Sequence, residues 1–195
     1  MDLQALLSLF GGTNLENLAS QLKVGSSEAK SGLSAALPSI MDALTKNTST
    51  TEGAEALNQA LEKNHDGSIL ENLSGFLNNP NLSEGAGILG HLFGNKTTNV
   101  ASAVSNASGM SNESSTKLLQ MLAPLVMGFL GKVKKETNLN ASGLNGLISM
   151  VSAGLNSKDG VNGLMSMLTG ALDNDKDGNV ADNLLNLAGG LFGKK

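Results

Sequence analysis

The chain has 195 residues, 40% of them hydrophobic, and a formal net charge of −4, so it can bury a core of ordinary size. It contains no Cys, which excludes disulfides, thiolate metal sites and thiol nucleophiles. It also lacks Trp, Tyr and Arg, and we therefore expect no nucleic-acid partner, because aromatic stacking and bidentate Arg contacts are both missing.

The sequence predicts neither a secretory signal nor a membrane span. The start, MDLQALLSLFGG, has an acid at position 2 and no basic region before its apolar residues. The longest apolar run, LLQMLAPLVMGFLG at 118–131, is shorter than the roughly 20 residues that a spanning helix needs. We expect a soluble, cytoplasmic protein, and export by a non-classical route stays open.

Apolar residues recur at three- and four-residue steps along the chain, which predicts helix after helix. The helices expected in the first half cover about 2–10, 13–23, 28–46, 50–61, 69–78 and 83–93. Those expected in the second half cover about 97–107, 112–136, 141–156, 160–172 and 180–192. Because no segment alternates with a period of two, the predicted fold class is all-α, a bundle of about ten short helices.

The two halves resemble each other. VGSSEAKSGLSAALPSIM at 24–41 aligns with MSNESSTKLLQMLAPLVM at 110–127, so that Pro38 falls on Pro124 at an offset of 86. A proline inside a helical pattern indicates a kink or a boundary. We therefore predict an internal duplication, with one helical repeat over 1–95 and a second over 96–195 that has about one extra helix. The two repeats could also form one fused domain.

The segment DNDKDGNVADNL at 173–184 resembles an EF-hand calcium loop. Three alternating carboxylates precede Gly178, at which such a loop turns sharply. A bidentate Glu belongs at position 12, but Leu184 stands there. The candidate calcium ligands are Asp173, Asp175, Asp177, Asn179 and Asp182. A helix-connecting turn is the alternative, because Asp-Gly is a common turn and acids are favourable before a helix.

A similar segment, EKNHDGSILENL at 62–73, provides fewer charges. Its candidate oxygen ligands are Glu62, Asn64, Asp66, Ser68 and Glu71. A longer acid stands first and fewer carboxylates follow, so we expect this loop to keep the turn without strong metal binding. Whether the loop over 62–71 binds any metal stays open.

No catalytic residues are predicted. His65 and His91 have no partner at the spacing of metal ligands, and we expect both to be solvated. The sequence has no nucleophile elbow, phosphate-binding Gly-Lys loop or dinucleotide fingerprint. Three glycines inside predicted helices are expected at close helix contacts: Gly32, Gly128 and Gly146. Calcium is the only cofactor that the sequence indicates.

Several short motifs resemble the bacterial family catalogued as domain of unknown function 937. They are ALPSIM at 36–41, DNDKDG at 173–178 and LAGGLFGK at 187–194, and the likeness covers nearly the whole chain. The resemblance implies a bacterial helical protein. It implies no catalytic residues, because the family has no defined activity.

We therefore expect a non-enzymatic structural or interaction protein that self-associates through apolar helix faces as an oligomer or filament. The terminal segments DLQALLSLF at 2–10 and LLNLAGGLFGKK at 184–195 could dock in neighbouring copies or pack in their own core. The alternative is a calcium-responsive helical module that binds another protein, in which the loop over 173–182 orders the last helix.

Overall fold

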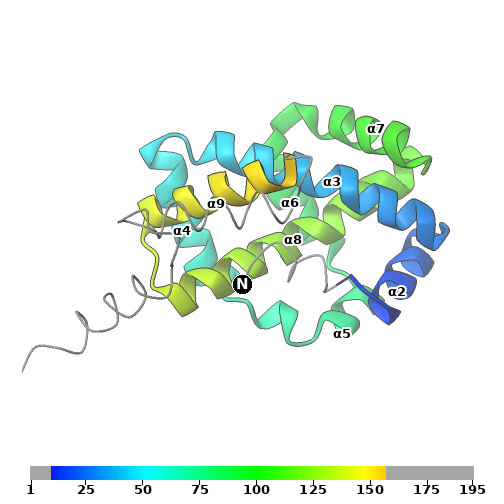
Figure 1. Ribbon diagram of the computed structural model, residues 1–195, viewed down its shortest axis with the longest axis horizontal. Helices are drawn as coiled ribbons and strands as arrows, with labels where there is room; N and C mark the ends of the chain where they lie inside the picture. The colour runs from blue at the N-terminus through cyan, green and yellow to red at the C-terminus, as the bar shows by residue number, and fades with distance from the viewer. Residues whose placement is uncertain (1–9, 157–195) are drawn as a thin grey trace, which may run out of the picture.

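The computed structural model describes residues 10–156, and every regular element in that range is helical (Figure 1). The predicted all-α class is therefore confirmed. In chain order the elements are α2 (Thr13–Leu22), α3 (Ser26–Asn47), α4 (Thr51–Asn64), the 3₁₀ helix η1 (Ser68–Leu70), α5 (Leu73–Asn78), α6 (Leu82–Phe93), the 3₁₀ helix η2 (Gly94–Lys96), α7 (Thr97–Ser108), α8 (Asn112–Thr137) and α9 (Ala141–Asn156). The helices predicted over 2–10, 160–172 and 180–192 lie outside the described residues, so the number of about ten stays a prediction.

The central element is α8. Every residue from Met121 to Leu130 is buried, because α8 is apolar on all sides and is surrounded by α3, α4, α6, α7 and η1. The second long helix, α3, crosses α8 and also packs on α2, α7 and α9. Within residues 10–156, no helix is both long and apolar enough to cross a membrane.

The single helix predicted over 69–78 is two elements. The chain forms η1, bends, and begins α5 at Leu73. The cause is Asn72, whose Oδ1 accepts a hydrogen bond from the Gly75 N–H at 3.1 Å. An Asn in this N-cap position favours the start of a new helix over continuation of the preceding turn.

Helices from both predicted repeats share one core. Pro38 lies inside α3, Pro124 lies inside α8, and the two helices pack on each other. One hydrophobic cluster extends from Phe10 to Val151, and α3 and α4 of the first half both pack on α9 of the second. The described residues of both halves therefore share one hydrophobic cluster, whereas the division into two repeats or one fused domain and the duplication itself stay predictions.

Glycines explain how closely some helices approach. A Cβ added at Gly32 would lie 2.8 Å from Leu118 Cδ2, and one at Gly128 would collide with the Ile69 side chain, as predicted. Among residues 10–156, no heavy atom lies within 4 Å of a Cβ built at Gly146, so the contact expected there is not found in the described part of the chain. No such contact was predicted at Gly85, yet α6 lies directly against the α8 backbone there.

Candidate binding groove

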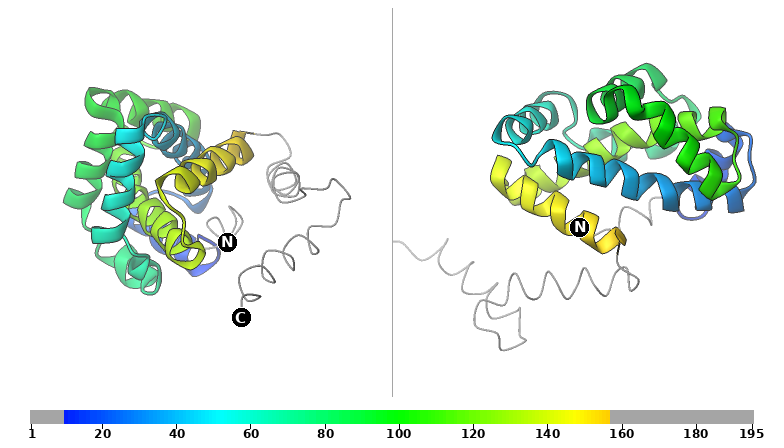
Figure 2. Two further views of the ribbon diagram at one scale, coloured as in Figure 1. Left: turned by 90° about the vertical axis from the view of Figure 1, so that its left-hand side faces the viewer. Right: turned by 90° about the horizontal axis from the view of Figure 1, so that it is seen from above.

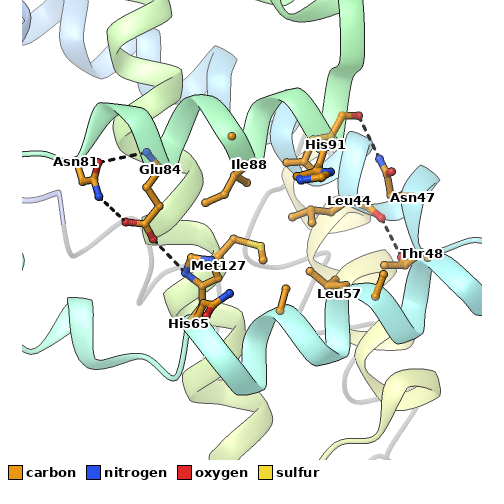
Figure 3. A pocket seen from close by; sticks show the side chains of 16 residues that line it. Leu44, Asn47, Thr48, Leu57, His65, Asn81, Glu84, Ile88, His91 and Met127 are labelled. Atoms are coloured by element: carbon orange, nitrogen blue, oxygen red, sulfur yellow. Dashed lines mark hydrogen bonds and ion pairs between the residues drawn. The ribbon is translucent and has the colours of Figure 1, made fainter.

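An apolar groove of about 740 Å³ lies between α4 and α6 (Figure 3). The two helices run antiparallel across it and are not among the helix pairs that pack closely. Its floor comes from Leu44 of α3 and Met127 of α8, both of which are buried. The groove is therefore a gap between two helices that pack on the same central pair.

The α4 wall is lined by small side chains. Gly53, Ala56 and Ala60 recur at steps of three and four residues, which places them on one face of the helix. Thr50 fixes the start of α4, because its Oγ1 accepts a hydrogen bond from the Gly53 N–H at 3.1 Å. A Cβ at Gly53 would collide with the Asn47 carbonyl, so this glycine allows α4 to approach the end of α3, whereas Ala56 and Ala60 add little bulk to the groove wall.

The α6 wall is more strongly apolar. Leu89 is buried on the face of α6 that packs against α8, whereas Ile88 and Leu92 are half-buried and line the groove. Asn81 caps this helix by accepting the Glu84 N–H at 3.2 Å, and its amide also donates to Glu84 Oε2 at 3.3 Å. An apolar face of α6 is thus open to an additional partner.

Side chains at the end of α3 close one end of the groove. The Asn47 amide donates to the carbonyl of Leu92 at 3.1 Å and to that of Ala43 at 2.8 Å, which joins α3 to α6. Thr48 is buried, and its Oγ1 lies 2.9 Å from the Leu44 carbonyl and 3.1 Å from Asn145 Oδ1. These contacts fix the separation of the helices at this end.

His65 and Glu84 stand at the other end. The expectation that His65 is solvated is wrong: it is 9% exposed, because the chain after α4 packs on α8, where the His65 carbonyl lies against Gly131. Its Nδ1 lies 3.6 Å from Glu84 Oε1. Burial lowers the pKa of His65, and the nearby Glu84 charge opposes this effect only in part. His91, by contrast, is exposed, as predicted.

The carboxylates of the first Asp-Gly loop have protein partners. Glu62 Oε1 lies 2.7 Å from Lys134 Nζ, and this hydrogen bond and charge lower the pKa of Glu62. Asp66 Oδ1 accepts the Ser68 N–H at 3.1 Å, which lowers the pKa of Asp66. The turn requires glycine at position 67, because the φ of Gly67 is +97° and a Cβ there would lie 2.6 Å from Lys132 Cβ of α8. This loop acts as a helix connection packed on α8.

The first loop provides no metal cluster. Among residues 10–156, no three His, Cys, Asp or Glu side chains are grouped so that they could hold a metal ion. Asn64, Ser68 and Glu71 of the first loop are exposed. The candidate ligands of the second loop, at 173–182, lie outside the described residues, so calcium binding there stays a prediction.

The comparisons with known proteins give a family. Residues 4–133, about two thirds of the chain, match the model of a family described as bacterial protein of unknown function (DUF937). The chain belongs to this family. Every residue that lines the groove of this DUF937 protein lies within the matched range. No curated protein matches the chain, and no solved structure does so either.

The groove has the chemistry of a binding surface. Among its lining residues, Thr48 has the only hydroxyl, and that hydroxyl is already in contact with two acceptors at the end opposite His65 and Glu84. A nucleophile and a base within hydrogen-bond reach of each other are therefore missing from the lining. The groove could have been suspected from the spacing of Gly53, Ala56 and Ala60 in the sequence. Their side chains are smaller and less hydrophobic than those of an ordinary core face.

Proposed function

We propose that this DUF937 protein is a non-enzymatic structural or interaction protein that binds further copies of itself through apolar helix faces. The α4–α6 groove is the acceptor surface. The observation that supports this most is an apolar groove of about 740 Å³ whose two walls do not pack on each other. Amphipathic helices bind in grooves of this kind by inserting apolar side chains spaced three and four residues apart.

The composition of the walls favours a helical occupant with large side chains. Gly53, Ala56 and Ala60 on α4 and Gly87 on α6 are small members of the lining, and Leu57, Ile88 and Leu92 add apolar surface to it. Leu or Phe side chains that enter such a space remove apolar surface from water, which contributes about 25 cal/mol per Å². A small-molecule substrate is less well supported, because the groove lacks a group that could activate it.

If the groove of one copy binds a surface of the neighbouring copy other than its groove, the contact joins two different surfaces and is heterologous. Such contacts repeat from one copy to the next, and they produce a ring when the rotation closes or an open filament when it does not. The duplication predicted between 24–41 and 110–127 would fit this scheme if it presents related faces in both halves.

A second candidate function is a calcium-responsive helical module that binds another protein. The carboxylates at Asp173, Asp175 and Asp177 support it, because hard cations bind such alternating oxygen ligands. In this alternative, calcium bound in the loop over 173–182 orders the last helix, and that helix exposes or covers the site at which the other protein binds.

Sedimentation velocity over a range of protein concentrations, with calcium and with chelator, tests both proposals. The decisive variant is Gly87→Lys, which adds bulk and charge inside the groove, and its control is Gly90→Lys on the same helix outside the groove. A Cβ at either position meets no heavy atom of residues 10–156 within 4 Å, so both variants should fold. We expect the wild type and Gly90→Lys to assemble in both buffers, and Gly87→Lys to need at least about tenfold more protein.

The outcomes separate the alternatives. A wild type that stays monomeric at every concentration would refute self-association. Assembly that Gly87→Lys leaves unchanged would place the interface away from the groove. Assembly that requires calcium would favour the second candidate, and Asp175→Ala combined with Asp177→Ala should then abolish it.

A further inference from the structure

The groove has an unbalanced negative charge at one end. Among the described residues, the only ion-pair partner of Glu84 is His65, at 3.6 Å. His65 is buried and its lowered pKa favours the neutral form, so it does not balance the carboxylate, which is about one third exposed. An occupant of this groove should therefore have large apolar side chains followed by a basic residue near Glu84.

One segment of this chain has that pattern. In LLNLAGGLFGKK, at 184–195, Leu184, Leu187 and Leu191 are spaced by three and four residues, as one face of a helix requires. Small residues at 188–190 would allow a close approach to the groove walls. Two lysines, Lys194 and Lys195, follow the apolar residues directly and provide the opposite charge to Glu84.

The tripeptide Leu-Phe-Gly of this segment occurs twice more in the chain. In the copy at 9–11, Phe10 is 4% exposed and belongs to the core. In the copy at 92–94, Phe93 is half-buried and packs against the core. Both described copies thus place their Phe on apolar surface, and we expect the same of Phe192 in the third.

The described chain ends on the side away from the groove. The last helix, α9, packs on α3 and α4, and α6 packs on α3 from the other side, as both views of Figure 2 show. From this side, a segment that follows α9 can reach the groove of an adjacent copy.

We infer that residues 184–195 of one copy bind in the α4–α6 groove of a second copy, with Lys194 or Lys195 near Glu84. This inference rests on the proposed function and names the segment that produces the self-association. Each copy then provides one groove and one segment, so the contact is head to tail and can propagate.

Mixing two variants of the full chain tests the inference. Gly87→Lys blocks the groove and keeps the segment, whereas Leu187→Asp damages the segment and keeps the groove. We expect each variant alone to sediment as a monomer at concentrations at which the wild type assembles. Mixed at equal concentrations, they should form a species of two chains, because one intact groove can receive one intact segment and the contact cannot repeat. Asn186→Asp, which adds the same charge at a polar position, should assemble like the wild type.

Failure of the inference differs from failure of the proposed function. If Leu187→Asp assembles like the wild type while Gly87→Lys does not, the groove binds another part of the neighbour, and only the inference is refuted. A wild type that never assembles refutes both. A labelled LLNLAGGLFGKK peptide should bind the Leu187→Asp chain and compete with wild-type assembly. If the peptide binds that chain but the wild type is monomeric, the segment occupies its own groove instead.

Discussion

At the scale of single residues, His65 couples the fold to pH. Burial lowers its pKa in the folded protein below the ordinary 6.5 that applies in the unfolded chain. Between those two values the unfolded chain binds more protons, so the free energy of unfolding decreases as the pH falls from above 6.5 through the folded pKa. Glu84, the charged group that faces His65, reduces the effect because it attracts the protonated ring.

The variant His65→Gln should therefore lose part of this pH dependence. We expect urea unfolding to show a smaller decrease in stability between about pH 7.5 and pH 5.5 for His65→Gln than for the wild type. His91→Gln is the control, because His91 is exposed and its replacement should leave the pH dependence unchanged. If the wild type and His65→Gln lose stability equally as the pH falls, carboxylates and not His65 cause the decrease.

At the scale of elements, the packing of α6 on α8 depends on one glycine. A Cβ at Gly85 would collide with the backbone carbonyl of Gln120, so Gly85→Ala should separate the two helices and lower the free energy of unfolding by about 2–3 kcal/mol. Gly90→Ala, on the same helix with open space around it, should raise it by about 0.5–1 kcal/mol through helix propensity. Urea unfolding of both variants measures the difference, and similar losses would show that the α6–α8 contact tolerates a methyl group.

Periodicity alone predicted most of the described helices, because their apolar faces are long and regular. The bounds of α3, α6, α8 and α9 agree with the expected 28–46, 83–93, 112–136 and 141–156 to within two residues. The division at Asn72 was not predicted, because one side-chain cap competes there with an otherwise helical pattern. The residues around Asn72 are compatible with a continued helix and with a new start, and packing against the surrounding helices decides between the two.

The candidate site was much less predictable than the helices. Gly85 and Gly146 both interrupt helical patterns, yet among the described residues Gly85 lies at a close helix contact and Gly146 does not, because this depends on which helix crosses the glycine. His65 follows α4 in a polar stretch that is typical of exposed loops, but the packing of that loop on α8 buries it. The groove likewise depends on the separation of α4 and α6, which no local pattern determines.

At the scale of the whole molecule, the important property is that one core joins both predicted repeats. Leu37 of α3 and Leu122 of α8 are both fully buried in the same hydrophobic cluster, although they belong to different halves of the sequence. In the described residues, α3 of the first half packs on α7, α8 and α9 of the second half, so each half covers apolar surface of the other.

A shared core predicts that both halves unfold in one cooperative transition. Leu37→Ala and Leu122→Ala should each lower the free energy of unfolding by about 2–5 kcal/mol and lower the midpoint of the same calorimetric peak. If the repeats were independent bundles, Leu37→Ala would shift one of two peaks and Leu122→Ala the other. The calorimetric enthalpy should equal the van't Hoff enthalpy for the wild type at concentrations too low for assembly. Because the groove is built from α3, α4, α6 and α8, it would then form only when both halves are folded, and partial unfolding of either half would abolish binding.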